Sequence, residues 1–271
     1  MSKILGDSRV RTEGFERHEY VVNGIRTVLY STGRGETLVY FHGAGTFHGF
    51  DFARDWTGDF RVVIPYHPGF GESQDDARID SMDDYVRHYA NLFDQMGLKK
   101  FNLVGCSMGG RMAAQFAADH GALLNKLVLV CPAGLDVPAH PMTNLADIPP
   151  GELLDYLIED VSVLDPFVPT WPDPQFGAMR ARETESVGRV LRNGSLVDPA
   201  LPASLARIDV ATLLLWGGED RVIPAAQAQT WANLLPDATV RVVAGAGHLI
   251  LDESVQARGA VKAFLRSGAD E

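Results

Sequence analysis

The segment Gly105-Cys106-Ser107-Met108-Gly109-Gly110 constrains this chain more than any other. It follows an apolar run at 101–104 with strand composition and precedes residues 111–118, which are good helix formers. Strand, tight turn and helix form the context in which G-x-S-x-G makes a nucleophile elbow. Glycines at 105 and 109 leave the turn free of side-chain bulk where the backbone crowds itself. We therefore predict that Ser107 is a nucleophile at the end of a strand.

Other glycine motifs fit this segment less well. A dinucleotide-binding G-x-G-x-x-G would need its second glycine at Ser107, and no Gly-Lys-Ser/Thr follows to make a phosphate-binding loop. An ordinary tight turn stays open, because a single G-x-S-x-G in a glycine-rich chain is a weak signal. The interpretation of Ser107 as the nucleophile of a hydrolase therefore needs catalytic partner residues elsewhere in the chain.

Composition and charge narrow the class of protein. The 271 residues are 46% hydrophobic with a formal net charge of −11, which is typical of a compact protein and disfavours nucleic acid and anionic membranes as partners. Residues 1–7 contain no apolar secretion signal, and no stretch approaches the ~18 apolar residues of a membrane span. Cys106 and Cys131 match neither a disulfide framework nor a zinc spacing, so we expect buried reduced thiols and a cytoplasmic location. A small-molecule substrate is the expected partner, and the oligomeric state stays open.

Strand and helix signals alternate along most of the chain. A hairpin is predicted from 18–22 and 25–30 around Asn23-Gly24, a type I′ turn signal. Further strands are predicted at 37–41, 60–65, 101–104, 126–131, 211–216 and 239–243. Ser81 opens a helix that Gly97 ends, another helix begins near Pro224, and a closing helix runs from about 253 to 266. This alternation predicts an α/β fold with a parallel sheet and crossover helices.

The alternation breaks between about residues 134 and 205. No strong strand is visible there, whereas 153–158 and 176–191 have helical composition, and the proline-rich stretch 166–174 suits neither regular element. We interpret this region as a helical cap inserted over the sheet. The predicted organisation is a core at 1–133, a cap at 134–205 and the second part of the core at 206–271.

A serine hydroxyl needs a neighbouring base and an acid that orients it. We assign the base to His248, which follows the last predicted strand after Gly247. The other histidines are less suitable, and His48 and His67 in particular lack a carboxylate at the right edge of the sheet. His42 is expected to brace the loop that follows its strand.

For the acid we assign Asp220, which follows the predicted strand at 211–216. Glu219 is too close in sequence to be excluded, and Asp136 is the main alternative. Nucleophile, acid and histidine then follow one another in the chain order expected of this kind of hydrolase, each just past the carboxyl end of a strand, where open α/β sheets bind ligands.

The loop His42-Gly43-Ala44-Gly45 should supply part of an oxyanion hole. Its backbone N–H groups, from Ala44 or Gly45, would act together with the N–H of Met108 on the carbonyl oxygen of a substrate. A plain glycine turn is the alternative. Aromatic and aliphatic residues near these loops are candidate pocket walls or ordinary core: Phe47, Phe70, Phe167, Trp171 and Ile250.

Together these segments resemble the α/β-hydrolase superfamily over essentially the whole chain. The matching segments are 42–45 (His-Gly-Ala-Gly), 68–73 (Pro-Gly-Phe-Gly-Glu-Ser), 105–110 (Gly-Cys-Ser-Met-Gly-Gly), 217–224 (Gly-Gly-Glu-Asp-Arg-Val-Ile-Pro) and 245–248 (Gly-Ala-Gly-His). The resemblance implies a Ser107–His248–Asp220 triad, no metal or organic cofactor, and a mainly parallel sheet of about eight strands with helices on both faces and a small helical cap. It is similar to the subgroup of esterases, lactonases and hydrolases that cleave carbon–carbon bonds.

Departures from the family pattern separate the possible activities. Carbon–carbon hydrolases of this kind often carry asparagine before the serine and tryptophan after the histidine, where this chain has Cys106 and Leu249. The leading hypothesis is a serine hydrolase that cleaves a small, fairly apolar carboxylic ester or lactone. A carbon–carbon hydrolase acting on a ring-fission product or β-diketone, with an arginine of the predicted cap (180, 182, 189 or 192) holding a carboxylate, is the second. A non-catalytic binding protein is the third.

Overall fold

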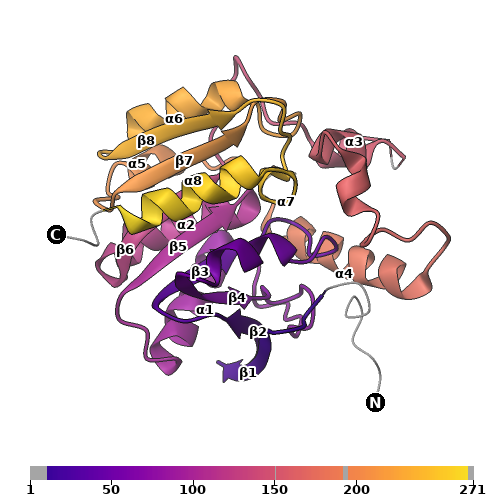
Figure 1. Cartoon of the computed structure of the whole chain (residues 1–271), viewed down its shortest axis with the longest axis horizontal. Helices are drawn as coiled ribbons and strands as arrows, with labels where there is room; N and C mark the ends of the chain where they lie inside the picture. Colours follow the sequence, from indigo (N-terminus) through magenta and orange to yellow (C-terminus); the bar gives the residue numbers. More distant parts are fainter. Residues whose placement is uncertain (1–10, 150, 192–194, 268–271) are drawn as a thin grey trace.

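A computed structural model of the chain describes residues 11–149, 151–191 and 195–267. These residues build an eight-stranded sheet with the strand order β1-β2-β4-β3-β5-β6-β7-β8 (Figure 1). The strands are β1 (Glu16–Val22), β2 (Ile25–Thr32), β3 (Glu36–Phe41), β4 (Phe60–Pro65), β5 (Phe101–Cys106), β6 (Leu124–Val130), β7 (Thr212–Gly217) and β8 (Ala238–Val243).

The sheet is mainly parallel, as the alternation of strands and helices predicts. Only β2 pairs antiparallel with its neighbours β1 and β4, whereas every pairing from β4 to β8 is parallel. The predicted hairpin turn is confirmed: Asn23 and Gly24 adopt φ values of 52° and 83°, which a type I′ turn requires. Strands β5 and β7 are buried along their whole length, as expected for parallel strands covered on both faces.

Helices cover the sheet and extend beyond its edge. They are α1 (Met82–Gln95), α2 (Met108–His120), α3 (Leu153–Leu157), α4 (Pro174–Val190), α5 (Leu201–Leu205), α6 (Ala228–Leu234), α7 (Ile250–Glu253) and α8 (Val255–Arg266). Helices α1 and α2 pack together, whereas α8 lies in front of the strands in Figure 1 and packs on β7 and on the 3-10 helix η1 (Asp51–Trp56).

The predicted start and end of α1 are confirmed. Ser81 precedes the helix in an extended conformation, and its side chain accepts a hydrogen bond from the N–H of Asp84 at 3.3 Å. The Asp84 carboxylate accepts in return from the N–H of Asp80, one residue before the cap. Gly97 follows the helix with a φ of 67°. The predicted closing helix is confirmed as α8, whose N-cap is Ser254, and the short helix α7 precedes it.

Helices α3 and α4 project from the side of the sheet where most of its strands end (Figure 1). This is the region that the sequence analysis assigned to a cap, but its last part packs differently from the rest. Leu201 and Leu205 of α5 are fully buried, and α5 packs against α2 of the core. Arg111 of α2 reinforces this contact through an ion pair with Asp198 at 2.6 Å. Helix α5 is therefore joined to the core by an apolar and an ionic contact.

The parallel register brings six loops to one edge of the sheet. Strands β3 to β8 all run in the same direction, so the residues that follow them meet at their carboxyl ends. These residues include Ser107 after β5, Asp220 after β7 and His248 after β8. Open α/β sheets bind their ligands at such an edge.

Candidate active site

Ser107 occupies a strained turn between β5 and α2. Its φ of 55° and ψ of −118° are unfavourable for a residue with a Cβ atom. Three backbone hydrogen bonds hold it there: its N–H donates to Val130 at 2.9 Å, and its carbonyl accepts from Arg111 at 3.0 Å and Ala133 at 3.1 Å. The side chain, in contrast to its buried neighbours, stays partly accessible. This is the geometry that presents a serine hydroxyl at a strand end.

The turn has no room for a side chain at Gly105 or Gly109. A Cβ atom at Gly105 would lie 2.4 Å from the carbonyl oxygen of Gly109. A Cβ atom at Gly109 would lie 2.3 Å from the carbonyl oxygens of both Phe41 and His42. Strand β5, helix α2 and the loop after β3 therefore approach one another too closely for any side chain at these positions.

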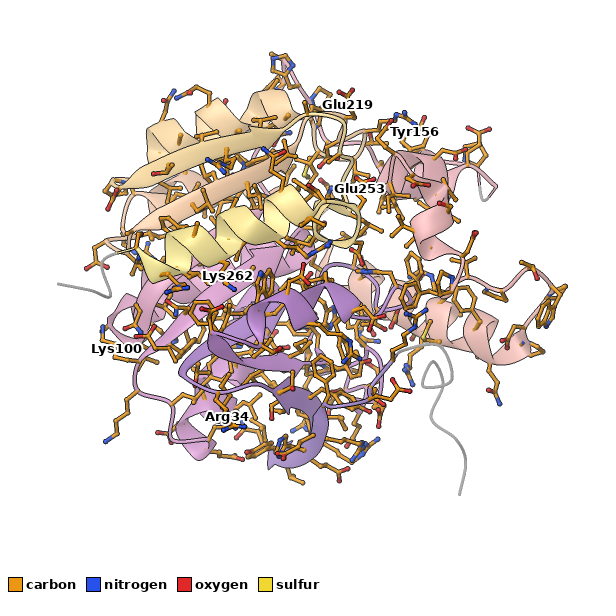
Figure 2. All side chains as sticks on the ribbon, viewed as in Figure 1. Arg34, Lys100, Tyr156, Glu219, Glu253 and Lys262 are labelled. Carbon is orange, nitrogen blue, oxygen red and sulfur yellow. The ribbon has the colours of Figure 1, made fainter. Side chains whose placement is uncertain are left out.

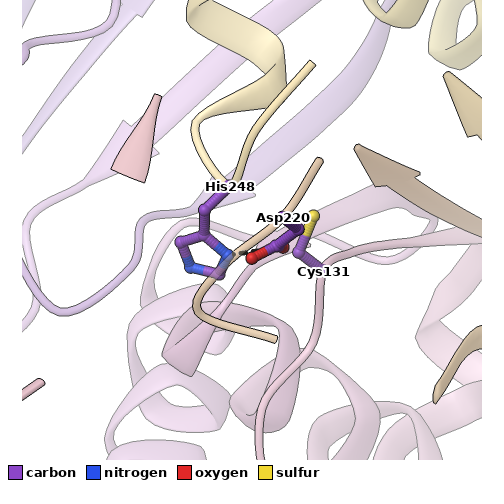
Figure 3. A group of neighbouring side chains, drawn as sticks. All are labelled: Cys131, Asp220 and His248. Carbon is purple, nitrogen blue, oxygen red and sulfur yellow. Dashed lines mark hydrogen bonds and ion pairs between the residues drawn. The ribbon is translucent and has the colours of Figure 1, made fainter. Parts of the chain in front are cut away.

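His248 and Asp220 form a buried hydrogen-bonded pair. The Nδ1 atom of His248 lies 2.8 Å from Oδ2 of Asp220 (Figure 3). The other carboxylate oxygen, Oδ1, accepts from the N–H groups of Val222 and Ile223, both at 2.8 Å. Hydrogen bonds thus hold both oxygens of the Asp220 carboxylate. Because Nδ1 of His248 is bound to Asp220, Nε2 is the ring nitrogen that stays available.

The acid alternatives named from the sequence lie elsewhere. Asp136 and Glu219 are both exposed, and neither hydrogen-bonds to His248 among the described residues. The N–H of Glu219 instead donates to the carbonyl of Ala246 at 2.9 Å, which ties the loop after β7 to the loop after β8. Glu219 therefore supports the pair through its backbone rather than through its carboxylate.

Ser107 and His248 face the same pocket at the edge of the sheet. Its lining combines residues that follow the sheet strands with Leu145, Leu153, Leu157 and Arg180 of the region predicted as a cap. The lining residues are Tyr40, Gly43, Ala44, Gly45, Phe47, His48, Cys106, Ser107, Leu145, Leu153, Leu157, Arg180, His248, Leu249, Leu251 and Asp252. Most of these side chains are apolar, so the pocket suits a small ligand with an apolar body.

The loop after β3 approaches the serine closely. A Cβ atom at Gly43 would lie 3.4 Å from Cβ of Ser107, and both Ala44 and Gly45 line the pocket. Met108 begins α2, so its N–H belongs to the first helical turn and has no partner within the helix. Within the described chain, the N–H groups of Ala44 and Gly45 also donate to no backbone carbonyl. The N–H of Met108 follows Ser107 directly, and those of Ala44 and Gly45 belong to a loop that lines the same pocket as Ser107.

Two neutral histidines hold this loop in place. The ring of His42 bonds to the carbonyl of Gly43 at 2.8 Å through Nδ1 and accepts from the N–H of His67 at 3.0 Å through Nε2. His67 donates from Nε2 to the carbonyl of His42 at 2.8 Å, and its Nδ1 bonds to the hydroxyl of Tyr89. Burial lowers the pKa of His42 to about 3 and that of His67 well below its usual value. Both rings are therefore neutral braces.

The prediction that His48 lacks a carboxylate partner is wrong. His48 does have a carboxylate partner, because its Nδ1 lies 3.1 Å from Oδ1 of Asp252, and both residues line the pocket. Burial tends to lower the pKa of His48, but the neighbouring Asp252 and Glu183 outweigh burial and the repulsion of Arg180, so the net shift is upward. Asp252 lies four residues after His248, and both residues line the pocket.

The structure places four of the five expected pocket walls away from this pocket. Phe47 lines it, but Phe70 and Ile250 are fully buried elsewhere, with Phe70 packed on the rings of His42 and His67. Phe167 is buried outside the lining, and Trp171 lies at the surface with 68% exposure. The proline-rich segment that carries Phe167 and Trp171 contributes nothing to the lining, whereas Leu153 and Leu157 of α3 do.

Cys131 completes a small buried cluster with Asp220 and His248 (Figure 3). The three offer sulfur, oxygen and nitrogen atoms within 4.8 Å of one another, a spacing that a metal ion could use. Both oxygens of Asp220 and Nδ1 of His248 are already engaged in hydrogen bonds, however. Burial also raises the pKa of the Cys131 thiol well above its usual value, whereas metals bind the thiolate. The cluster therefore does not fit a metal ion.

The segment at α3 is hydrogen-bonded to the loop and helix that follow His248. Tyr156 and Glu253 mark the two sides of the junction between α3 and the core (Figure 2). The N–H of Leu249 donates to the carbonyl of Leu157 at 2.7 Å, and the Glu253 carboxylate accepts from the N–H of Glu159 at 3.0 Å. Helix α3 is thus joined directly to the residues that flank His248.

Comparisons with known proteins agree with this architecture. The model of the Alpha/beta hydrolase family matches residues 38–261. A 2-hydroxy-6-oxononadienedioate/2-hydroxy-6-oxononatrienedioate hydrolase of Comamonas testosteroni is 28% identical over 85% of this chain and 87% of its own length. A dihydrolipoyllysine-residue acetyltransferase component of an acetoin cleaving system from Cupriavidus necator is also 28% identical over 84% of this chain, which spans 63% of that protein. The crystal structure of a bacterial membrane phospholipase A superposes with a TM-score of 0.79 at 25% identity, covering 96% of this chain and 88% of the other.

The family match spans the parallel sheet, the serine turn and the histidine–aspartate pair described above. It confirms both the fold and the family that the sequence motifs resemble. The chain belongs to the alpha/beta hydrolase family and is an enzyme of the hydrolase type.

Proposed function

We propose that the protein hydrolyses a small, fairly apolar carboxylic ester or lactone through an acyl-enzyme, with Ser107 as nucleophile, His248 as base and Asp220 as the acid that orients His248. The observation that carries this proposal is the 2.8 Å bond between His248 and Asp220 beside a pocket that both His248 and Ser107 line. The bond occupies Nδ1 and reserves Nε2 for the serine proton.

The proposed reaction has two halves. His248 takes the proton of Ser107 as the hydroxyl oxygen attacks the carbonyl carbon, and it returns that proton to the departing alcohol. The resulting acyl-enzyme is cleaved by water, which His248 deprotonates in the same way, and the acid product leaves. Asp220 stabilises the imidazolium in both halves without being protonated itself.

The proposed oxyanion hole consists of the N–H of Met108 together with that of Ala44 or Gly45. Small residues at 43–45 let the backbone approach the reacting oxygen, and each such donor is typically worth ~10²–10³ in rate. The neutral His42–His67 brace supports the donors of Ala44 and Gly45, since it fixes the carbonyls of His42 and Gly43, which directly precede them in the chain.

The pocket wall favours an ester over a carbon–carbon substrate. Cys106 and Leu249, the two positions where this chain departs from the carbon–carbon hydrolases it resembles, both line the pocket. Burial raises the pKa of Cys106 to about 12, so its thiol is neutral. The leucines at 145, 153, 157, 249 and 251 add an apolar surface suited to a short alkyl or aryl group.

Carbon–carbon cleavage stays the second candidate because of one pocket residue. Arg180 of α4 lines the pocket and could hold a substrate carboxylate. The relative from Comamonas testosteroni is named as a hydrolase of a dienedioate, a substrate with two carboxylates. Arg180 is, however, already 3.4 Å from the carboxylate of Glu183, which offsets its charge.

A substrate panel distinguishes the two candidates. We expect the wild type to hydrolyse p-nitrophenyl butyrate and a simple lactone faster than a ring-fission dienoate or a β-diketone, and Ser107→Ala to reduce ester turnover by several orders of magnitude. Equal unfolding midpoints of the two proteins would show that the fold is intact. Undiminished turnover by the variant would refute the nucleophile, and a preference for the dienoate would favour the second candidate.

A further inference from the structure

Glu183 is a fully buried carboxylate on cap helix α4, whose other faces are largely exposed. A buried charge is costly unless hydrogen bonds compensate for it. Glu183 accepts from the hydroxyl of Thr46, from the N–H of Thr46 at 3.2 Å and from the N–H of Gly71 at 3.3 Å. Arg180, one turn earlier, contributes a fourth contact at 3.4 Å. The carboxylate therefore binds two loops of the core at once.

The first of these loops carries the proposed oxyanion donors. Thr46 directly follows Gly45 and is two residues from Ala44, so a bond to its backbone N–H fixes the position of that short segment. Arg180 presses on the same segment: a Cβ atom at Gly45 would lie 2.5 Å from Nη1, and its guanidinium lies 4.8 Å from the ring centre of Phe47. Glu183 and Arg180 of α4 thus both contact the segment at 45–47.

The second part of α4 is attached to the core by different residues. Arg189 forms an ion pair with Asp75, and the hydroxyl of Ser186 lies 3.5 Å from the carbonyl of Gly69. Neither contact involves the loop after β3. Ser186 and Arg189 therefore attach the helix without touching the oxyanion loop, so this attachment can be altered while the contact of Glu183 with Thr46 stays in place.

We propose that Glu183 is a positioning residue for catalysis: its carboxylate, delivered by the cap, holds the Ala44–Gly45 segment so that its N–H groups point at the developing oxyanion. This rests on the proposed function. The cap in this arrangement completes the oxyanion hole as well as covering the substrate. Loss of the carboxylate then weakens transition-state stabilisation more than substrate binding.

The test separates positioning from simple attachment of the cap. We expect Glu183→Gln to lower kcat for p-nitrophenyl butyrate by about 10–100-fold with KM changed less than about threefold, because misaligned donors act mainly in the transition state. The affinity for an alkylboronic acid, which forms a tetrahedral adduct with the serine, should fall in parallel. Arg189→Met is the matched control, since it weakens attachment of α4 at Asp75 and should leave kcat within about twofold.

A second pair of variants keeps the proposal testable if Glu183→Gln folds poorly. Thr46→Val removes the hydroxyl donor and should lower kcat, whereas Thr46→Ser retains the donor and should restore it. A kcat for Glu183→Gln within twofold of wild type would overturn the proposal, and so would equal losses in Glu183→Gln and Arg189→Met. Failure of the wild type to hydrolyse any ester would instead refute the proposed function, so the two failures are distinguishable.

Discussion

Ser107 shows how a strained residue is kept in place. A side chain in this region of backbone conformation costs about 1–3 kcal/mol, and the surrounding structure offsets that cost through backbone hydrogen bonds from β6 and α2. The absence of side chains at Gly105 and Gly109 lets the loop after β3 approach within contact of Ser107. Ser107 therefore combines a strained backbone and close packing of its neighbours with a side chain that stays partly accessible.

The residues of the site differ in how far the sequence could predict them. Ser107, Asp220 and His248 each follow a strand in a short motif, so their position at one edge could be inferred. Glu183 could not be inferred in this way, because it lies on an exposed-looking helix and its burial depends on the cap folding onto the loop at Thr46. The pairing of His48 with Asp252 likewise joins residues about 200 positions apart.

His88 gives a prediction about pH at the residue scale. Burial lowers its pKa to about 4, and its Nε2 bonds to the hydroxyl of Thr27 at 2.9 Å. Between the unfolded pKa of ~6.5 and the folded value, the unfolded chain binds a proton that the folded chain does not. The free energy of unfolding therefore falls as pH decreases through this window, by about 2 kcal/mol from this residue between pH 8 and pH 5.

Urea denaturation at pH 8 and pH 5 measures this effect. Between pH 8 and pH 5, we expect the free energy of unfolding of His88→Gln to fall by about 2 kcal/mol less than that of the wild type, because glutamine does not titrate. His42 and His67 shift in the same direction and stay in the variant as an internal background. Parallel losses in both proteins would contradict the assignment of a lowered pKa to His88.

At the scale of elements, local signals settle some boundaries and distant packing settles others. Helix α1 has a capping serine, an apolar stripe and a terminal glycine, so its bounds follow from the sequence. Helix α5 has only five residues and no such signals, and its position depends on burial of Leu201 and Leu205 against α2. The cap predicted at 134–205 thus includes at its end a helix that packs on α2 of the core.

The cap of α1 provides a prediction for one element. Ser81→Ala removes the hydroxyl that accepts from Asp84 and should lower the free energy of unfolding by about 1 kcal/mol. Ester turnover should stay unchanged, because the helix start lies outside the pocket lining. Thermal or urea unfolding measures the loss, and Ser81→Asp, which can also cap, is the control expected to retain most of the stability. No difference between the alanine and aspartate variants would contradict a capping role.

At the scale of the whole molecule, one sheet edge organises the chemistry. The parallel strands bring residues between positions 40 and 252 into one pocket, and the predicted cap region adds Leu145, Leu153, Leu157 and Arg180. The sequence predicts the sheet because strands and helices alternate, and it predicts a cap because that alternation stops. It does not predict which cap residues turn inward, since their direction depends on how α3 and α4 pack on the core. None of the described helices is long and apolar enough to cross a membrane.

In the proposed function, the polar atoms that converge at this edge make Ser107 abnormally nucleophilic. Labelling with a fluorophosphonate, followed by peptide mass spectrometry, measures that reactivity directly. We expect one adduct per chain on Ser107 in the wild type, and labelling of His248→Gln slowed by about 10³-fold or more because the base is lost. An unlabelled Ser107 in folded wild-type protein, or equally fast labelling of the His248→Gln variant, would contradict the account.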